Sequence, residues 1–262
     1  MDPDEITARL AACVREAGAL ALSMFGTPLK AWTKAGSAPV SEADIAVDRL
    51  LRHRLAAGDA GFGWLSEESV DDNTRLTRRY VWIVDPIDGT RAFLAGAPDW
   101  CVSAALVEAG RPMAACLYAP VTEEFFVATA GKGATRNGAA ISATAGTSIA
   151  GARVAGPTRF LERLAGIAPP FEAMPRVRSL ALRLARVAQG ALDVAIAGSD
   201  SHDWDLAAAD LLVHEAGGAL TTVAGGAVIY NRPVPRHGTL VASGRNRHGT
   251  LVELLGDERL AS

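Results

Sequence analysis

The sequence contains little cysteine, no dense run of basic residues and no long apolar segment. Its three cysteines show no C-x-x-C spacing, which argues against a disulfide framework or a zinc site and favours small core residues in a reducing compartment. A net charge of −3 without a stripe of Lys and Arg argues against binding to a nucleic-acid polymer. No run approaches the ~18 apolar residues of a membrane span, and the N-terminus has no signal-peptide pattern. We therefore expect a cytoplasmic protein that acts on small partners.

The composition is that of a globular chain with a large core, because 49% of the 262 residues are hydrophobic and 21% are charged. Apolar residues at helical spacing predict a helix over 3–25, with Asp2 as its N-cap. A second helix is predicted to begin at Ser41, whose hydroxyl would cap it, with Asp44 in its first turn. Strand-like runs joined by turns at 109–112 and 131–133 predict antiparallel hairpins after this helix pair.

The composition shifts at residues 142–151, a stretch of Ser, Thr, Ala and Gly, and we predict a boundary there. The boundary divides one compact unit into an N-terminal α+β half, 1–141, and a C-terminal α/β half, 142–262. Beyond it, strands are expected in GARVAG, ALDVAIAG, GGAVIYNRP and HGTLVASG, and helices in TRFLERLAG, SLALRLARVAQG, WDLAAADLLVHEAGG and HGTLVELLGDERLA. Strands that alternate with helices indicate an α/β layer.

Carboxylates follow apolar, strand-like runs at two places in the N-terminal half. The run from Tyr80 to Val84 leads into Asp85 and Asp88, and the run GWLS leads into Glu67. Each carboxylate alone is typical of a turn, because such side chains bond nearby backbone N–H groups. Together they favour a hard divalent cation such as Mg²⁺, since like charges without a cation would repel one another and raise a pKa.

The segment DPIDGT also suits a phosphate group. Proline stiffens the turn between the two carboxylates, and the backbone N–H groups of Gly89 and Thr90 stand at the predicted start of a short helix that reaches Phe93. Far downstream, Asp205 in SHDWDLAAAD stands at another predicted helix start, either as a helix cap or as a remote metal ligand. This pattern favours a cation and a phosphate bound side by side.

Four segments, SEADIAVD, WLSEES, WIVDPIDGTRAF and HDWDLAAAD, resemble in this order the motifs of the inositol monophosphatase superfamily of magnesium-dependent, lithium-sensitive phosphatases. The resemblance covers nearly the whole chain. It implies a mixed α/β fold of α+β character, a layered α/β/α/β/α sandwich with the site where its two halves meet. It also implies a homodimer, for which the apolar, strand-rich segment 100–126 is a candidate interface.

The resemblance further implies a role for each residue of these motifs. The implied metal ligands are Glu67, Asp85, the carbonyl of Ile87, Asp88 and Asp205. The implied catalytic residues are Asp44, Glu67 and Thr90, of which Asp44 and Thr90 position the attacking water. The residues implied to contact the substrate are Asp88, Gly89, Thr90 and Asp205. With two or three Mg²⁺ ions in the site, displacement would proceed in line, without a phospho-enzyme.

Two positions bear on which small phosphate ester is the substrate. Inositol-specific members have a glutamate seven residues before the W-D aspartate, where this chain has Gly198, and the difference puts strict inositol specificity in doubt. Arg183 falls where nucleotidase-type members carry a basic residue and would pair with a second phosphate; an exposed arginine on an amphipathic helix is the alternative. The expected substrate is 3′-phosphoadenosine 5′-phosphate, as in the 3′(2′),5′-bisphosphate nucleotidases, or inositol monophosphate. DGTRAF also resembles histidinol-phosphatases, so histidinol phosphate is an alternative.

A different class of function is a catalytically silent relative that binds RNA or a protein partner, because a fold does not fix a function. The intact set of carboxylates argues for the enzyme. A silent binder has no physical reason to keep these like charges clustered and uncompensated.

Overall fold

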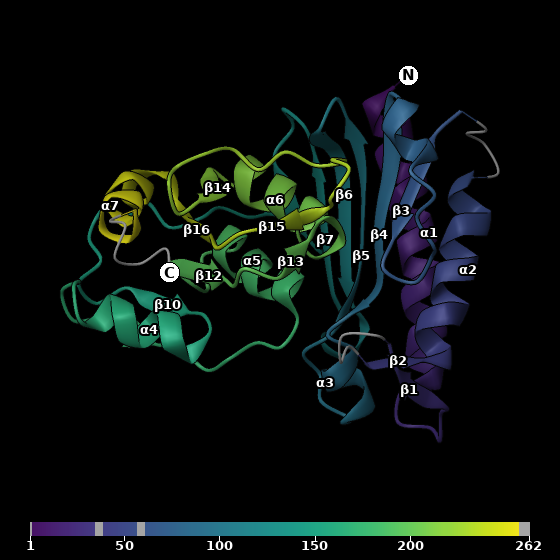
Figure 1. Ribbon diagram of the computed structural model, residues 1–262, viewed down its shortest axis with the longest axis horizontal. Helices are drawn as coiled ribbons and strands as arrows, with labels where there is room; N and C mark the ends of the chain where they lie inside the picture. Colours follow the sequence, from purple (N-terminus) through teal and green to yellow (C-terminus); the bar gives the residue numbers. More distant parts are fainter. Residues whose placement is uncertain (1, 35–38, 57–60, 257–262) are drawn as a thin grey trace.

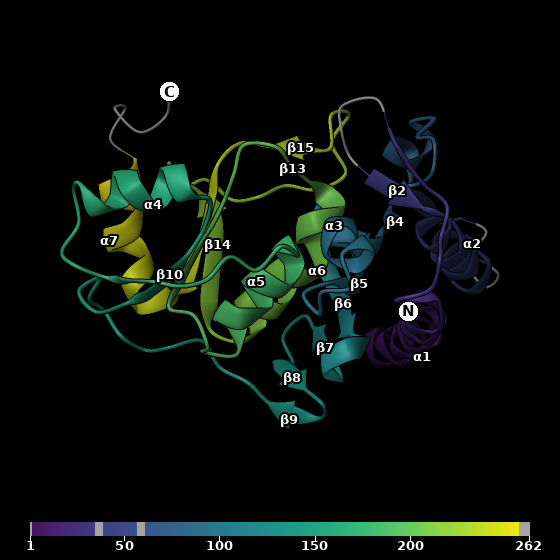
Figure 2. The ribbon, with the colours of Figure 1, turned by 90° about the horizontal axis from the view of Figure 1, so that it is seen from below.

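Two large β-sheets alternate with three layers of helices in the computed structural model, which describes residues 2–34, 39–56 and 61–256 (Figure 1). The order is α1 and α2, a seven-stranded sheet, α5 and α6, a five-stranded sheet, then α4 and α7, and a second view shows the same order (Figure 2). Each gap between a sheet and a helical layer is filled by buried apolar side chains. The predicted α/β/α/β/α sandwich is confirmed.

The outer helical layer on the N-terminal side consists of α1, Pro3–Met24, and α2, Glu42–Ala56. The predicted cap of α1 is present, since Asp2 Oδ1 accepts the Asp4 N–H at 2.9 Å. Leu10 and Val14 of α1 are fully buried against the sheet, as the helical spacing predicts. The start of α2 differs from the prediction: Ser41 ends strand β2, Pro39–Ser41, which pairs with β1, Ala31–Thr33.

The first sheet contains both predicted hairpins. Its strands, in spatial and chain order, are β3 Gly63–Ser66, β4 Tyr80–Asp88, β5 Cys101–Glu108, β6 Arg111–Ala119, β7 Glu124–Thr129, β8 Ala134–Arg136 and β9 Ala139–Ala140. The β3–β4 pair is parallel and the other neighbours are antiparallel. The β5–β6 turn needs positive φ at Ala109 and Gly110, 48° and 79°, which is the geometry of a tight hairpin turn. The apolar side chains of 100–126 fill the core on both sides of this sheet, so their burial needs no second subunit.

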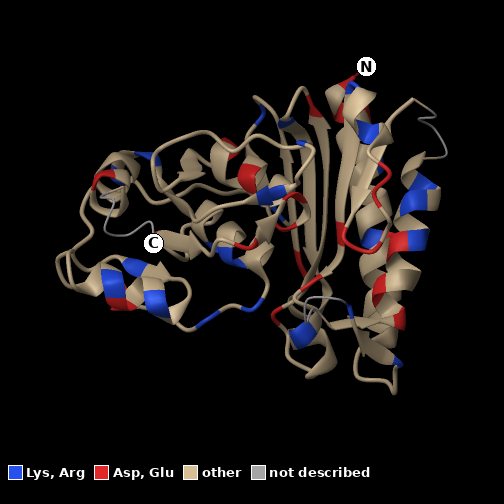
Figure 3. Ribbon diagram, viewed as in Figure 1, with Lys and Arg blue, Asp and Glu red and all other residues tan. Residues whose placement is uncertain are grey.

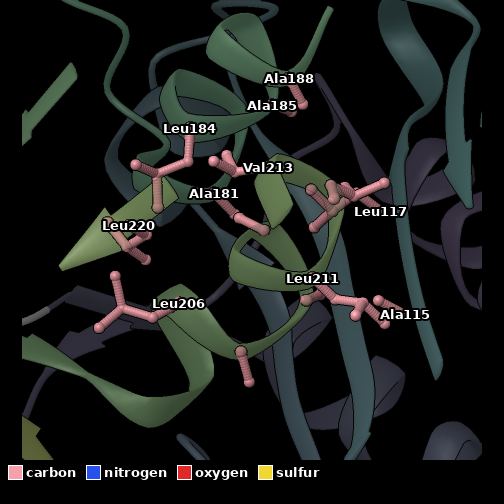
Figure 4. Packing of buried hydrophobic residues seen from close by; sticks show 14 of the residues in the cluster. Ala115, Leu117, Ala181, Leu184, Ala185, Ala188, Leu206, Leu211, Val213 and Leu220 are labelled. Carbon is pink, nitrogen blue, oxygen red and sulfur yellow. The ribbon is translucent and has the colours of Figure 1, made fainter. Parts of the chain in front are cut away.

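The middle layer consists of α5, Leu180–Ala188, and α6, Asp203–Glu215, which lie between the two sheets. Both helices are rich in alanine, so their backbones approach each other and both sheets closely. In Figure 4, Leu211 of α6 points toward Ala115 and Leu117 of β6 in the first sheet. Leu184 of α5 lies on the opposite side, toward Leu220 of the second sheet. The core therefore joins parts of the chain from both sides of residues 142–151, and the division into two halves stays a prediction.

The second sheet has the spatial order β11-β10-β12-β16-β14. Its strands are β10 Arg153–Ala155, β11 Glu172–Ala173, β12 Val194–Ala197, β14 Gly218–Thr222 and β16 Leu240–Gly244. The helices α4, Thr158–Ala165, and α7, Arg245–Leu255, cover its outer face. The predicted final helix therefore begins three residues earlier than expected, and its predicted end beyond residue 256 lies outside the described residues. No described helix is both long and apolar enough to cross a bilayer.

The strand predicted in GGAVIYNRP is wrong, because the edge strand is β14 and the segment that follows it forms only an isolated bridge, Thr221 with Ala227. Long-range contacts hold this segment instead. The Tyr230 N–H donates to Gly110 O at 3.0 Å, and Arg111 Nη1 donates to the carbonyl of Val228 at 2.5 Å. Val228 and Tyr230 are thus buried beside the β5–β6 turn rather than in a ladder, whereas Ile229 is exposed.

Candidate metal and phosphate site

Carboxylates from three distant segments meet beside α3, Thr90–Leu94, where the first sheet approaches the α5–α6 layer. One oxygen from each of Asp85, Asp88 and Asp205 lies within 4.8 Å of the other two. Glu67, just past the end of β3, lines the same cavity of about 470 Å³. Figure 3 shows acidic residues at the ends of these strands, close to basic residues of α3 and of the loop before α5. The residues predicted from WIVDPIDGTRAF, WLSEES and HDWDLAAAD are therefore brought together.

Strand β4 does not end before the two aspartates, as the sequence predicted, but continues through Asp88. Its register against β5 shifts between Asp85 and Asp88, which marks a bulge. Residues three apart in a regular strand point to opposite faces, so the bulge is what aims both carboxylates at one cavity. The Ile87 N–H donates to Asp85 Oδ1 at 3.0 Å and holds that carboxylate in place.

The carboxylate of Asp88 lies at the N-terminus of α5. Ser179 Oγ donates to Asp88 Oδ2 at 2.5 Å, and the Ala181 N–H donates to the same oxygen at 2.7 Å. Ser179 also caps α5, because its hydroxyl accepts the Leu182 N–H at 3.0 Å. These donors and the helix dipole favour the charged carboxylate and fix its orientation.

Asp205 fulfils both roles considered for it. As the third residue of α6 it accepts the His202 N–H through Oδ2 at 2.6 Å, which satisfies a backbone donor at the helix start. The same carboxylate contributes an oxygen to the three-aspartate group. The ring of His202 stacks on Trp204, with centroids 4.6 Å apart, as an ordinary packing contact.

Asp44 and Thr90 form the pair that the resemblance implies. Thr90 Oγ donates to Asp44 Oδ1 at 3.1 Å and lies 3.0 Å from the carbonyl oxygen of Ile87. The other Asp44 oxygen accepts both the hydroxyl and the N–H of Ser41, at 2.6 and 2.8 Å. The expected cap is thus reversed, since the Ser41 hydroxyl donates to Asp44 rather than accepting from the helix. Asp44 is 1% exposed and lies behind Thr90.

Gly89 links β4 to α3 in a conformation that requires glycine. Its φ is 96°, and a Cβ at this position would lie 2.9 Å from the carbonyl oxygen of Asp99. The tight turn brings the backbone of Gly89 and Thr90 to the wall of the cavity, beside the carboxylates. This is the place where the resemblance implies phosphate binding.

The carboxylates of the site repel one another and are poorly solvated. Burial is the largest cause that raises the pKa of Asp85 and Asp205, and neighbouring carboxylates raise both further. Burial also raises the pKa of Glu67 to about 7, although the Lys34 ammonium, 3.6 Å from Glu67 Oε1, opposes the shift. Such a cluster is costly without a cation, because protonation or a metal must offset the charge.

The residues fit Mg²⁺. They offer only oxygen atoms, which this hard cation prefers, and one oxygen from each of the three aspartates lies within 4.8 Å of the other two. The bulge in β4 and the N-terminal turns of α5 and α6 provide a rigid frame for these ligands.

Arg183 does not line the cavity. Its side chain is 5% exposed, and its guanidinium donates to the backbone carbonyls of Val177 and Ile196. The predicted pairing of Arg183 with a second phosphate is therefore not supported by the geometry, because its donors are already used inside the protein. Burial raises the pKa of Asp88, and the charge of Arg183 opposes this rise together with the hydrogen bonds from Ser179 and the start of α5.

Residues 2–259 match the profile of the inositol monophosphatase family, and the chain belongs to that family, whose members are magnesium-dependent phosphatases that hydrolyse phosphate monoesters. It is 36% identical over 242 residues to a protein named glucose-1-phosphate thymidylyltransferase from Streptomyces griseus, with 88% of this chain and 92% of that protein covered. It is also 36% identical over 240 residues to a histidinol-phosphatase from Mycobacterium tuberculosis, with 86% and 90% covered. The solved structure of the extragenic suppressor protein suhB from Bartonella henselae matches with a TM-score of 0.84 and 27% identity, over 97% of this chain and 99% of that one. The predicted family is confirmed, and with it the class of enzyme.

Proposed function

We propose that this protein hydrolyses a small phosphomonoester with a water molecule activated at a site of two or three Mg²⁺ ions. The observation that supports this most directly is the convergence of Asp85, Asp88 and Asp205 on one point, next to the Asp44–Thr90 pair. The ions would lower the pKa of a bound water and offset the negative charge of the phosphoryl oxygens and the leaving alkoxide.

Thr90 and Asp44 orient and deprotonate the attacking water in this proposal. The hydroxyl hydrogen of Thr90 is directed at Asp44 Oδ1 and the Ile87 carbonyl, so the lone pairs of Oγ remain to accept a hydrogen bond from water. Burial raises the pKa of Asp44, which makes this carboxylate a better proton acceptor than an exposed one. Thr90 passes the proton of the water to Asp44.

Glu67 and the turn before α3 supply the remaining groups that would hold the ions and the phosphate. The carboxylate of Glu67 lies at the edge of the cavity, where it would hold an ion and the water bound to that ion. Gly89 and Thr90 would present backbone N–H groups to the phosphate, and the turn at Gly89 would align these groups in advance. The leaving alcohol then points away from the carboxylates, toward the mouth of the cavity.

The substrate in this proposal is 3′-phosphoadenosine 5′-phosphate or inositol monophosphate. Inositol-specific members have a glutamate where this chain has Gly198. The absence of this carboxylate favours the nucleotide as the substrate. Histidinol phosphate is the second candidate, because the M. tuberculosis relative is named a histidinol-phosphatase. The predicted homodimer, lithium sensitivity and cytoplasmic location belong to the same proposal.

Phosphate release from a panel of these three esters, with Mg²⁺, with EDTA and with added Li⁺, tests the proposal. We expect Mg²⁺-dependent release that EDTA abolishes and Li⁺ inhibits. No release from any ester would contradict it and would favour the catalytically silent RNA- or protein-binding regulator.

A further inference from the structure

The cavity has two electrostatic poles. Its floor is formed by the carboxylates described above, and its wall also includes three arginines: Arg91 in the first turn of α3, and Arg176 and Arg178 in the loop between β11 and α5. The basic segments lie beside the acidic strand ends in Figure 3. All three arginines are exposed, and together they give this wall a positive potential that favours an anionic ligand.

The guanidinium groups of Arg176 and Arg178 differ from those of the two arginines of α5 in their lack of partners. Arg186 pairs with Glu124, and Arg183 donates to backbone carbonyls. Across the ranges that the structure describes, no hydrogen bond or ion pair engages the guanidinium of Arg176 or Arg178. Their donors are therefore available to a ligand in the cavity.

Charges of both signs lie near this loop. Burial lowers the pKa of Arg183, Asp88 opposes that shift, and the positive charge of Arg176 adds to it. The backbone N–H of Arg178 donates to Asp99 Oδ2 at 2.7 Å, so a carboxylate holds the loop backbone. In the described part of the chain neither loop guanidinium pairs with that carboxylate, so both remain available to a ligand.

In the proposed reaction the phosphate that is hydrolysed would be held by the carboxylate-bound Mg²⁺ ions and the α3 turn, so it would not need these arginines. A cavity of about 470 Å³ exceeds what one phosphate group requires and falls in the ~300–1,000 Å³ range of sites for whole small ligands. Guanidinium groups match phosphate oxygens with two parallel hydrogen bonds. A second phosphate on the leaving alcohol is the group that fits the mouth of this cavity.

We infer that Arg176 and Arg178, with Arg91 on the same wall, form a subsite for a second phosphate of the substrate. The inference rests on the proposed phosphatase function and assigns its substrate class: alcohols that carry two phosphate groups, of which only one is hydrolysed. It replaces Arg183 as the predicted contact. It also disfavours histidinol phosphate, whose amine is cationic and would be repelled by the same arginines.

The contribution of this subsite to hydrolysis can be measured with a matched pair of substrates. Adenosine 3′,5′-bisphosphate and adenosine 3′-monophosphate share the phosphate that is hydrolysed and differ only in the second one. We expect the wild-type kcat/KM to favour the bisphosphate by about tenfold or more, the effect of one partly screened, charge-assisted hydrogen bond. In the R176A/R178A double variant this ratio should fall toward one through a higher KM for the bisphosphate, with the monophosphate unchanged within about twofold.

Two further variants separate charge from fold. R176K/R178K retains the charge but loses the paired hydrogen bonds, so it should recover part of the ratio. Arg245→Ala, an exposed arginine at the start of the distant helix α7, should leave the ratio unchanged. The subsite is overturned if wild type shows no preference for the bisphosphate, or if the double variant loses both substrates equally while Mg²⁺-dependent hydrolysis persists.

A binding measurement makes the test independent of turnover. Adenosine 5′-monophosphate, the product that keeps the second phosphate, is titrated in the presence of Mg²⁺ and saturating inorganic phosphate, with thermal stability as the readout. Wild type should bind it about tenfold more tightly than R176A/R178A. Equal affinities of wild type and R176A/R178A for adenosine 5′-monophosphate would overturn the subsite, even if the protein hydrolyses none of the esters. If wild type binds it more tightly but hydrolyses no ester, only the proposed function is contradicted.

Discussion

Ser179 connects the start of α5 to the metal ligand Asp88, and its replacement by alanine tests whether this connection orients the site. The hydroxyl donates to Asp88 Oδ2 at 2.5 Å and accepts the Leu182 N–H at 3.0 Å, and it also lies 3.5 Å from Cys101 Sγ. The side chain is fully buried, so water does not replace it. Ser179→Ala removes both bonds and adds no bulk.

The two losses have different magnitudes and different readouts. Removal of the cap should reduce the free energy of unfolding by about 1 kcal/mol. Removal of the bond to Asp88 raises the pKa of that carboxylate and frees its rotation, which should weaken Mg²⁺ binding by about 10- to 100-fold, the usual cost of losing such an outer partner. Activity at low Mg²⁺ should fall by the same factor and recover at high Mg²⁺.

Titration of activity against Mg²⁺, with thermal unfolding in parallel, measures both effects. Asp2→Ala is the matched control, because Asp2 caps α1 far from the site, and its loss should lower stability alone. If Ser179→Ala loses stability but binds Mg²⁺ with unchanged affinity, then Ser179 is only a helix cap, and the argument that α5 orients Asp88 is refuted.

Three other predictions follow from the same geometry. Asp44→Asn should lower kcat by at least about 100-fold with little change in KM, because it removes the proton acceptor behind Thr90; an equal rise in KM would instead indicate a role in binding. Gly89→Ala should destabilise the protein by about 1–3 kcal/mol in chemical denaturation, since φ is 96° and the Cβ would contact Asp99; wild-type stability would refute the strain. In EDTA, the melting temperature should fall as pH rises from about 5 to 8. The reason is that the pKa of Glu67, about 7, and the pKa of Asp85 are raised above their values in the unfolded chain. The folded state therefore binds more protons than the unfolded state in this window. Mg²⁺ should reverse this trend, and a flat profile in EDTA would contradict it.

Residues in contiguous motifs were predictable from the sequence. DPIDGT places two carboxylates and a glycine turn within six residues, and the family resemblance assigned Glu67, Asp205 and Asp44 to the same site from their motifs alone. The structure brings all of them together. The layered fold was also predictable, because the family resemblance implies it and the helix and strand periodicities on both sides of residues 142–151 agree with it.

Residues whose role depends on a distant partner were not predictable. Ser179 was expected neither as a cap nor as a partner of Asp88, although a serine directly before the helical run LALRL is a capping signal. Its partner is 91 residues away, a relation that no local pattern contains. Arg183 was misassigned for the same reason, since helical spacing does not reveal that a guanidinium turns inward to backbone carbonyls.

The strand predicted in GGAVIYNRP shows how tertiary contacts override a propensity. Val228 and Tyr230 are buried, as β-prone residues usually are, but the Tyr230 hydroxyl bonds Asp210 at 3.1 Å and its N–H bonds the β5–β6 turn. These contacts leave no backbone register for a ladder with β14.

Mg²⁺-dependent phosphate release by wild type and Asp88→Asn tests the central claim most directly. Asparagine keeps the shape of the side chain, and its oxygen can still accept the bonds from Ser179 and Ala181, so the fold should survive and thermal unfolding should confirm this. We expect phosphate release from adenosine 3′,5′-bisphosphate to fall by at least about 100-fold, because a charged metal ligand is lost. A folded Asp88→Asn protein that releases phosphate at the wild-type rate would contradict the assignment of the metal site.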